Sequence, residues 1–339
     1  MKRFYLFMLY SLGTSSILAG EHCTRDNPLR SQLTRQHAPV IIAYRDDGNG
    51  KGAVYDHYTI QHITNHPTEF SVPKKLDISC FETYLNGQPY NLPHGSTNKQ
   101  DKQIPPICKK SYEGGLLILP GRRDAQLSVD ENPSYKYRKP HEQCALKEAR
   151  LRGQPVLAIC AGSWELWESF GGTTIDVQHH QHLPMLTLNT DGTISNNVQV
   201  HDISIEEESI LAKAMGSYTS KISVNSIHGK AVDERYPPNQ LIITARTIAN
   251  LIHEGAEISE QDDALPPNVS EPHTVEAFET KHGTPMLGLQ YHSEGYYTTT
   301  PTETDRRHMN IIRYMAKAGD AYQAKRRMLL QLSSAFVLN

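Results

Sequence analysis

A nucleophile, a base and a carboxylate suited to acyl transfer occur at the ends of apolar segments, and Cys160 is the first. It comes after the apolar run Pro155–Ile159 and before a helical pattern at Ser163–Phe170, with small residues between. A strand that turns directly into a helix exposes its turn residue, and only small neighbours fit there. The start of a helix also favours a thiolate. The pattern predicts a nucleophile elbow; a structural cysteine at the end of a buried strand is the alternative.

His292 and Glu294 follow the last apolar segment of the chain, Met286–Tyr291. An amide is a poor electrophile, so its cleavage needs a strong nucleophile and a site that stabilises the developing charge. An imidazole beside Cys160 would keep the sulfur ionised and later protonate the leaving amine. A carboxylate beside that imidazole would orient it and stabilise its charged form. These residue types predict amide hydrolysis through a thioester, a reaction that needs no metal or organic cofactor.

The elbow, the segment LILPGRRD (Leu117–Asp124) and the segment GLQYHSEG (Gly288–Gly295) occur in the order of a known family. Together they resemble the class I glutamine amidotransferase domain, within it the gamma-glutamyl hydrolase and gamma-glutamyl-GABA hydrolase branch, peptidase family C26. The resemblance extends from about Pro39 to about Tyr297. It implies a Cys–His–Glu triad on a doubly wound, mostly parallel α/β sheet flanked by helices, a flavodoxin-like arrangement.

The same resemblance implies roles for six further residues. Oxyanion-hole N–H groups are implied around Gly121, Arg122 and Ala161, and substrate contacts at Trp164, Ser226 and His228. Ser226 and His228 lie in VNSIHG, which resembles a segment typical of the hydrolase branch. His228 is either a substrate contact or a hydrogen-bonding residue of the core.

Five positions depart from the family pattern, and the smallest change is Ala158 in place of the glycine two residues before the cysteine. Ala161 stands where an arginine often follows the cysteine, and Arg122 replaces the second glycine of the turn. Ser293 replaces the proline of the His-Pro-Glu motif but leaves the His-x-Glu spacing intact. Trp164 replaces a glutamine that lines the glutamyl pocket in relatives. The last departure bears on which acyl group is recognised.

The elements that must position these residues alternate between strands and helices in the first half of the chain. Expected strands are Pro39–Tyr44, Glu69–Val72, Gly114–Pro120 and Pro155–Ile159, and expected helices are Tyr55–Asn65, Pro140–Arg152 and Ser163–Phe170. Continuous apolar runs such as GGLLILP are typical of buried parallel strands. This order predicts an α/β fold with parallel strands.

The second half has strands of a more polar kind before the final apolar strand. These expected strands are Val198–Ile203, Ile222–Val224, Leu241–Ala245 and His273–Glu279. Asn86–Ile107 and Glu254–Pro272 have the composition of surface loops. Thr304–Leu332 is predicted to be a helix packed on the domain with its basic face solvated. Glu165 and Glu168 are predicted to be surface or capping carboxylates of the elbow helix.

The N-terminus has the order of a secretory signal peptide. Lys2 and Arg3 precede an apolar run from Phe4 to Ala19 that ends in small residues. The run is short for a membrane span, which needs about 20 residues; an uncleaved anchor is the alternative. We therefore expect a signal peptide at residues 1–20, a hydrolase domain at 21–300, a helical extension at 301–339, and a secreted or periplasmic protein with no membrane association after cleavage.

The four cysteines other than Cys160 could form up to two disulfides in an oxidising compartment. They are Cys23, Cys80, Cys108 and Cys144, and the sequence does not choose among their three possible pairings.

A formal net charge of −3 gives no basic field for nucleic acid. A histidine cluster at His179, His180 and His182 lacks the cysteine or carboxylate partners of a metal motif, which favours a solvated loop.

Three functions fit the sequence. The first is a secreted cysteine hydrolase that cleaves gamma-glutamyl amide bonds in a small molecule or a peptide. The second is a non-catalytic member of the family whose altered pocket binds a ligand or partner. The third, a glutaminase subunit that supplies ammonia to a synthase, fits less well because the chain carries no synthase domain. The oligomeric state is not indicated by the sequence.

Overall fold

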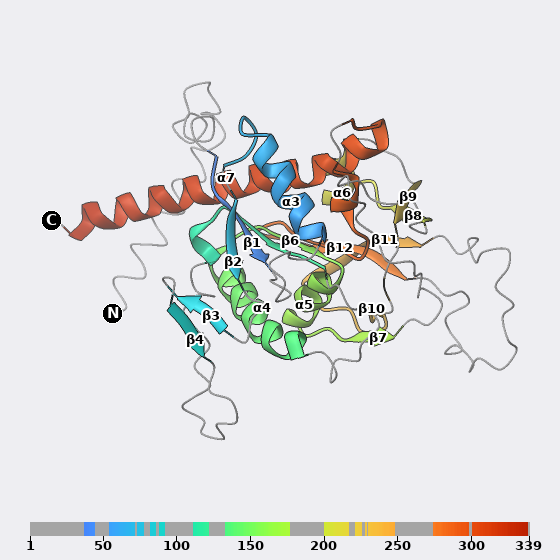
Figure 1. Ribbon diagram of the computed structural model, residues 1–339, viewed down its shortest axis with the longest axis horizontal. Helices are drawn as coiled ribbons and strands as arrows, with labels where there is room; N and C mark the ends of the chain where they lie inside the picture. Colours follow the sequence, from blue (N-terminus) through green and yellow to red (C-terminus); the bar gives the residue numbers. More distant parts are fainter. Residues whose placement is uncertain are drawn as a thin grey trace, which may run out of the picture.

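A nine-stranded mixed sheet forms the centre of the computed structural model (Figure 1), with strand order β2-β1-β5-β6-β13-β12-β11-β8-β9. The structure describes residues 37–44, 54–71, 73–77, 82–85, 88–91, 111–121, 133–176, 200–216, 221–225, 228, 230–247, 274–297 and 300–337. The first five strands of that order are parallel: β2 (Lys74–Asp77), β1 (Val40–Tyr44), β5 (Leu116–Leu119), β6 (Val156–Ile159) and β13 (Met286–Leu289). The remaining strands are antiparallel to their neighbours: β12 (Val275–Thr280), β11 (Leu241–Thr247), β8 (Val200–Ile205) and β9 (Lys221–Asn225).

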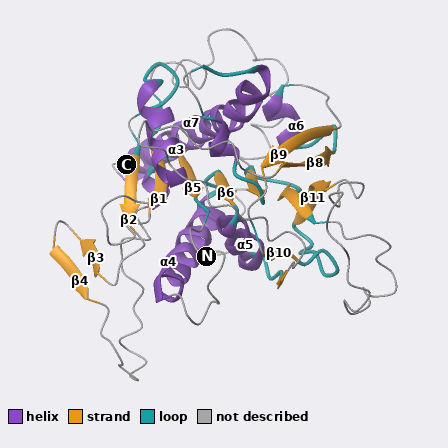
Figure 2. Ribbon diagram, turned by 45° about the vertical axis from the view of Figure 1, so that its right-hand side comes forward, coloured by secondary structure: helices purple, strands orange, loops and turns teal. Residues whose placement is uncertain are grey.

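Helices cover both faces of the parallel half of the sheet. Helices α4 (Pro133–Arg152) and α5 (Ala161–Ser169) lie on one face, and α3 (Val54–Asn65) and α7 (Glu303–Val337) on the other (Figures 1 and 2). Strands β5 and β6 are buried along their whole length, which explains why their sequences are continuous apolar runs. The expected α/β architecture is confirmed.

The register of the parallel strands brings the carboxyl ends of β6 and β13 together. Ile159 pairs with Leu289 at the last position of both strands. Residues that follow these two positions must therefore lie close in space, although they are far apart in the chain. Catalytic groups in open α/β sheets are found at this edge.

The first half of α7 belongs to the core of the domain. Ile311, Ile312 and Met315 are completely buried against the sheet. The carboxylate of Asp320 accepts a hydrogen bond from the Ala38 N–H at 2.6 Å, just before β1. Tyr322, Gln323 and Ala324 are still buried, and beyond them the helix projects past the sheet (Figure 1). No helix in the ranges given above is long and apolar enough to cross a membrane.

One predicted strand is wrong. Glu69 lies in a turn, where its N–H and that of Phe70 both donate to the His66 carbonyl, and the second strand begins at Lys74. Pro73 separates the apolar residues from the strand. The expected loops at Asn86–Ile107 and Glu254–Pro272 fall mostly or wholly outside the described residues, as do residues 1–36.

Five short elements have no counterpart among the predicted ones. They are β3 (Glu82–Leu85), β4 (Gln88–Asn91), β7 (Thr174–Asp176), α6 (Ile210–Met215) and β10 (Lys230–Val232). β3 pairs with β4, and β7 pairs with β10, each in a small separate antiparallel sheet. Elements this short carry too few residues to show a hydrophobic period.

Candidate active site

Cys160 occupies the turn between β6 and α5 in a conformation that side chains rarely adopt. Its φ of 50° makes it the one non-glycine residue with positive φ in the described part of the chain. Its N–H donates to the Leu289 carbonyl at 2.7 Å, and its carbonyl accepts from the Ser163 N–H at 2.9 Å. Gly162 must be small, because a Cβ there would lie 2.4 Å from the Leu119 carbonyl oxygen. A strained residue held by such contacts is typical of functional sites.

His292 and Glu294 lie directly beyond β13, where the strand register places them beside the elbow. Glu294 belongs to the short 3-10 helix η5 (Ser293–Tyr296). His292 Nδ1 donates to Glu294 Oε1 at 3.0 Å, and the imidazole also hydrogen-bonds Cys160. Since Nδ1 contacts the carboxylate, Nε2 is the nitrogen left for the sulfur. The structure therefore brings together the three residues expected to form a triad.

The electrostatics of this group favour a thiolate–imidazolium pair. Burial by itself lowers the pKa of His292, because a charged imidazole loses its hydration. The negative charges of Cys160 and Glu294, with their hydrogen bonds, outweigh burial and raise the pKa well above 6.5. An imidazolium beside sulfur stabilises the thiolate, which is the reactive form of cysteine.

Gly121 and Ala161 border the sulfur from two elements. A Cβ at Gly121, directly after β5, would lie 2.4 Å from His292 Cε1 and 3.1 Å from Cys160 Cβ. Only glycine leaves room there for the imidazole. Ala161 is the first residue of α5, where N–H groups have no acceptor within the helix. Both residues adjoin Cys160, and their part in an oxyanion hole stays a prediction; Arg122 lies outside the described residues.

Asn225, at the end of β9, contacts the main chain of His292. Asn225 Nδ2 donates to the His292 carbonyl and the His292 N–H donates to Asn225 Oδ1, both at 2.8 Å. Asn225 was not among the residues that sequence reasoning assigned a role. Its only signal is its place in VNSIHG, where the neighbouring serine and histidine drew attention instead.

Comparison with known proteins agrees with this geometry. The profile of the peptidase C26 family matches residues 84–294, more than half of the chain. The chain belongs to the peptidase C26 family. This membership supports hydrolysis of amide bonds by a cysteine hydrolase. No curated protein gives a significant match to the C26 chain.

Solved structures show the same fold at low identity. The glutaminase domain of CTPS from Trypanosoma brucei, with bound acivicin, is 14% identical with a TM-score of 0.50, covering 82% of this C26 protein and 94% of that chain. A glutamine amidotransferase from Methylobacillus flagellatus is 12% identical, with a TM-score of 0.42 and coverages of 85% and 94%. A glutamine amidotransferase from Thermotoga maritima is 15% identical, with a TM-score of 0.40 and coverages of 76% and 77%. The match to the CTPS glutaminase domain shows that the C26 protein has the class I glutamine amidotransferase fold.

Trp164 and His228, two of the residues expected to contact substrate, are both buried. The indole N–H of Trp164 donates to Gln290 Oε1 at 2.9 Å, and the ring is almost completely buried. His228 is buried too; its Nδ1 donates to the Lys230 carbonyl at 3.1 Å, and its Nε2 lies 3.5 Å from Glu276 Oε1. Ser226 lies outside the described residues. The structure shows His228 as a hydrogen-bonding residue of the core, and its contact with substrate stays a prediction.

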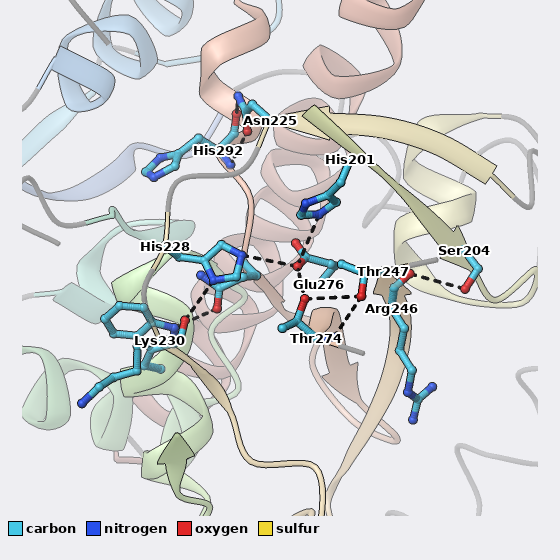
Figure 3. A network of polar contacts seen from close by, with 12 residues as sticks. His201, Ser204, Asn225, His228, Lys230, Arg246, Thr247, Thr274, Glu276 and His292 are labelled. Atoms are coloured by element: carbon cyan, nitrogen blue, oxygen red, sulfur yellow. Dashed lines mark hydrogen bonds and ion pairs between the residues drawn. The ribbon is translucent and has the colours of Figure 1, made fainter. Parts of the chain in front are cut away.

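Glu276 of β12 is the centre of a buried polar network in this C26 protein (Figure 3). Glu276 Oε1 accepts from Thr274 Oγ1 at 2.8 Å and lies 3.4 Å from His201 Nε2. Burial alone would raise the pKa of Glu276, but His201 and His228 lower it below its ordinary value. The strand Val275–Thr280 carries two glutamates, Glu276 and Glu279, and the sequence analysis assigned a role to neither.

Glu165 is not a surface carboxylate. It is 1% exposed between α5 and α4, and Gln143 Nε2 donates to its Oε2 at 2.6 Å. Glu168, one turn later, pairs with Lys139 and is partly exposed. The prediction for Glu165 was wrong because a short helix gives no reliable apolar face, and α4 covers the side on which Glu165 lies.

Replacing Glu165 by glutamine is expected to make the stability less dependent on pH. Burial, and then the charge of Glu142, raises the pKa of Glu165 from 4.5 to about 7. The folded protein therefore binds this proton more tightly than the unfolded chain does. As the pH rises from about 4.5 to about 7, ionisation of Glu165 lowers the free energy of unfolding. Above about pH 7 the loss reaches about 3 kcal/mol. Thermal melts should show Glu165→Gln above wild type at pH 8 and near it at pH 4.5.

Glu168→Gln is the matched control, since it alters a carboxylate of the same helix whose Lys139 partner is partly exposed. At pH 8 its melting temperature should not rise above wild type, because the substitution removes an ion pair with Lys139 and not a buried carboxylate. A Glu165→Gln protein that melts below wild type at pH 8 would contradict the assignment.

Two further observations concern metals and cysteines. Among the described residues no group of three or more His, Cys, Asp or Glu side chains is arranged to hold a metal ion. The cluster at His179, His180 and His182 lies outside them. Cys144 is disulfide-bonded, and Cys160 is the described cysteine that is not in a disulfide.

Proposed function

We propose that the protein is a secreted cysteine hydrolase that cleaves gamma-glutamyl amide bonds through a thioester acyl-enzyme. The observation that carries the proposal is the contact of His292 with both Cys160 and Glu294 at the carboxyl edge of the sheet. The family supports amide hydrolysis. The VNSIHG segment, which resembles the gamma-glutamyl hydrolase branch, favours a gamma-glutamyl acyl group.

The proposed mechanism has two acyl-transfer steps. The Cys160 thiolate attacks the gamma-carbonyl carbon, and N–H groups around Gly121 and Ala161 stabilise the oxyanion. The His292 imidazolium gives its proton to the leaving amine, which departs as the thioester forms. Neutral His292 then takes a proton from water, which attacks the thioester and releases glutamate. Glu294 keeps the imidazole oriented and stabilises its charged form in both steps.

Export is proposed from the sequence of residues 1–20, which has the order of a signal peptide. The disulfide of Cys144 is in keeping with this, because structural disulfides persist mainly in oxidising compartments. Substrate and enzyme would then meet outside the cytosol, where no synthase partner is needed.

The test is a panel of gamma-glutamyl compounds: a folate polyglutamate, a gamma-glutamyl polyamine and a gamma-glutamyl dipeptide, each paired with its alpha-linked isomer. We expect glutamate release from at least one gamma-linked compound and none from its isomer. Rapid acid quenching and mass spectrometry should find the acyl group on the peptide that contains Cys160. Equal cleavage of both linkages would reject gamma-glutamyl specificity while keeping the hydrolase.

One observation favours the second function, a ligand- or partner-binding module. Trp164 stands where relatives have the glutamine that lines the glutamyl pocket, and its indole N–H donates to Gln290 Oε1. A buried indole at this place leaves less room for a glutamyl group than an amide side chain does. Absence of release across the whole panel, with no acyl group on Cys160, would favour this function.

A further inference from the structure

We propose that Asn225 is a positioning residue that fixes the catalytic histidine by holding its main chain. The inference rests on the proposed function, since it assigns Asn225 to the same triad. Nothing in the resemblance gave this residue a role, and its contact with His292 joins positions 67 residues apart.

The contact is a reciprocal pair of hydrogen bonds. The Asn225 amide presents one donor and one acceptor to the two sides of His292, its N–H and its carbonyl, and both distances are 2.8 Å. Both residues are buried, at 7% and 2% exposure. Buried bonds of this kind are expensive to leave unmade, so the pair specifies one arrangement of the His292 backbone. Figure 3 shows the two residues together at one end of the polar network.

The triad itself does not supply this restraint. Glu294 lies only two residues after His292 on the same segment, so their contact moves with the segment. His292 has φ −93° and ψ 86°, between the end of β13 and η5, where no strand ladder continues. Asn225 belongs to β9, the edge strand at the far end of the sheet from β2, which does not pair with β13. It therefore ties the histidine segment to an independent element.

Asn225 also makes a hydrogen bond through its main chain to Tyr296 of η5, which packs on α7. Its own N–H donates to Tyr296 Oη at 2.8 Å. The Tyr296 ring stacks on His308 of α7 with centroids 3.8 Å apart and an angle of 13°. His308 is completely buried. The main chain of Asn225 is thus linked, through Tyr296 of η5, to the buried ring of His308 on α7.

The test measures Cys160 reactivity, which needs no substrate. Full-length wild type and Asn225→Ala are alkylated with iodoacetamide between pH 5 and pH 9, and the Cys160 peptide is quantified by mass spectrometry. An imidazolium held beside the sulfur keeps wild-type alkylation fast well below pH 8.5, where an ordinary thiol ionises. Asn225→Ala should react about tenfold more slowly at pH 6, with its profile moved upward by about one pH unit.

Ser209→Ala is the control for lost stability alone. Ser209 caps α6, accepting from the Ala212 N–H at 3.0 Å, and has no part in the triad. It should lower the melting temperature and leave the alkylation profile unchanged. If Asn225→Ala does not fold, Asn225→Ser replaces it; this variant removes both hydrogen bonds without adding a charge and should shift the profile in the same direction.

An alkylation profile of the Asn225 variants that coincides with wild type would overturn the inference. So would a wild-type Cys160 that reacts only above about pH 8.5, because no histidine would then be paired with it. Failure of the proposed function looks different. Cys160 would be alkylated rapidly at low pH in an Asn225-dependent way, and no gamma-glutamyl compound would be cleaved.

Discussion

Replacing Cys160 by alanine is expected to abolish glutamate release from gamma-glutamyl substrates, by a factor of at least about 10⁴ in kcat/KM. The reason is that the thioester forms on the sulfur, and the other described cysteine, Cys144, is disulfide-bonded. The substitution removes one atom and leaves the strained turn in place. Melting temperature and circular dichroism should therefore stay close to wild type while activity is lost. Activity is measured at matched concentrations of folded protein.

Cys160→Ser tests whether ionisation of the nucleophile, and not the size of its side chain, is needed for activity. A serine hydroxyl is nearly the size of the thiol but is far harder to ionise, so His292 cannot hold it as an anion. We expect Cys160→Ser to be almost as inactive as Cys160→Ala. Release of glutamate at the wild-type rate by either variant would show that another residue is the nucleophile, and the proposed mechanism would be wrong.

The parts of this site that sequence reasoning could place are those set by local rules. The continuous apolar runs before Gly121 and Cys160 became the buried strands β5 and β6, and small residues marked the turn to α5. The parallel register then requires that residues after β13 meet residues after β6. The meeting of His292 with Cys160 follows from strand order, and the contact with Glu294 follows from spacing.

The parts that could not be predicted depend on how distant elements pack. Asn225 lies on the edge strand β9, which does not pair with β13, and no pattern in the sequence of β9 shows that its last residue contacts His292. Glu165 is buried because α4 covers its side of α5. Glu276 is buried because two histidines, from β8 and from the segment after β9, surround it. In each case a polar residue is inside because its partners come from elsewhere in the chain.

Replacing Glu294 by glutamine is expected to lower kcat/KM by about 10²–10⁴ and to weaken the charged form of His292. Glutamine keeps the size of the side chain and can still accept from His292 Nδ1, but it carries no charge. Glu294 is one of the groups that raise the pKa of His292 against burial. Without its charge the pKa of His292 falls, the imidazolium is less populated at neutral pH, and Cys160 loses its counter-ion. The alkylation profile of Cys160 should therefore move to higher pH together with the loss of activity.

Glu279→Gln serves as the matched control for removing a buried carboxylate charge. Glu279 lies on β12, where its Oε2 accepts from the Ile210 N–H at 2.8 Å, and burial raises its pKa to about 6. Its replacement should leave the alkylation profile and kcat/KM near wild type, because its charge acts at the start of α6 and not at the elbow. If Glu294→Gln and Glu279→Gln had the same small effect, the carboxylate beside His292 would be structural only. The active unit would then be a Cys160–His292 pair. Its imidazole would be held by the contact with the sulfur and by the hydrogen bonds between Asn225 and the His292 main chain.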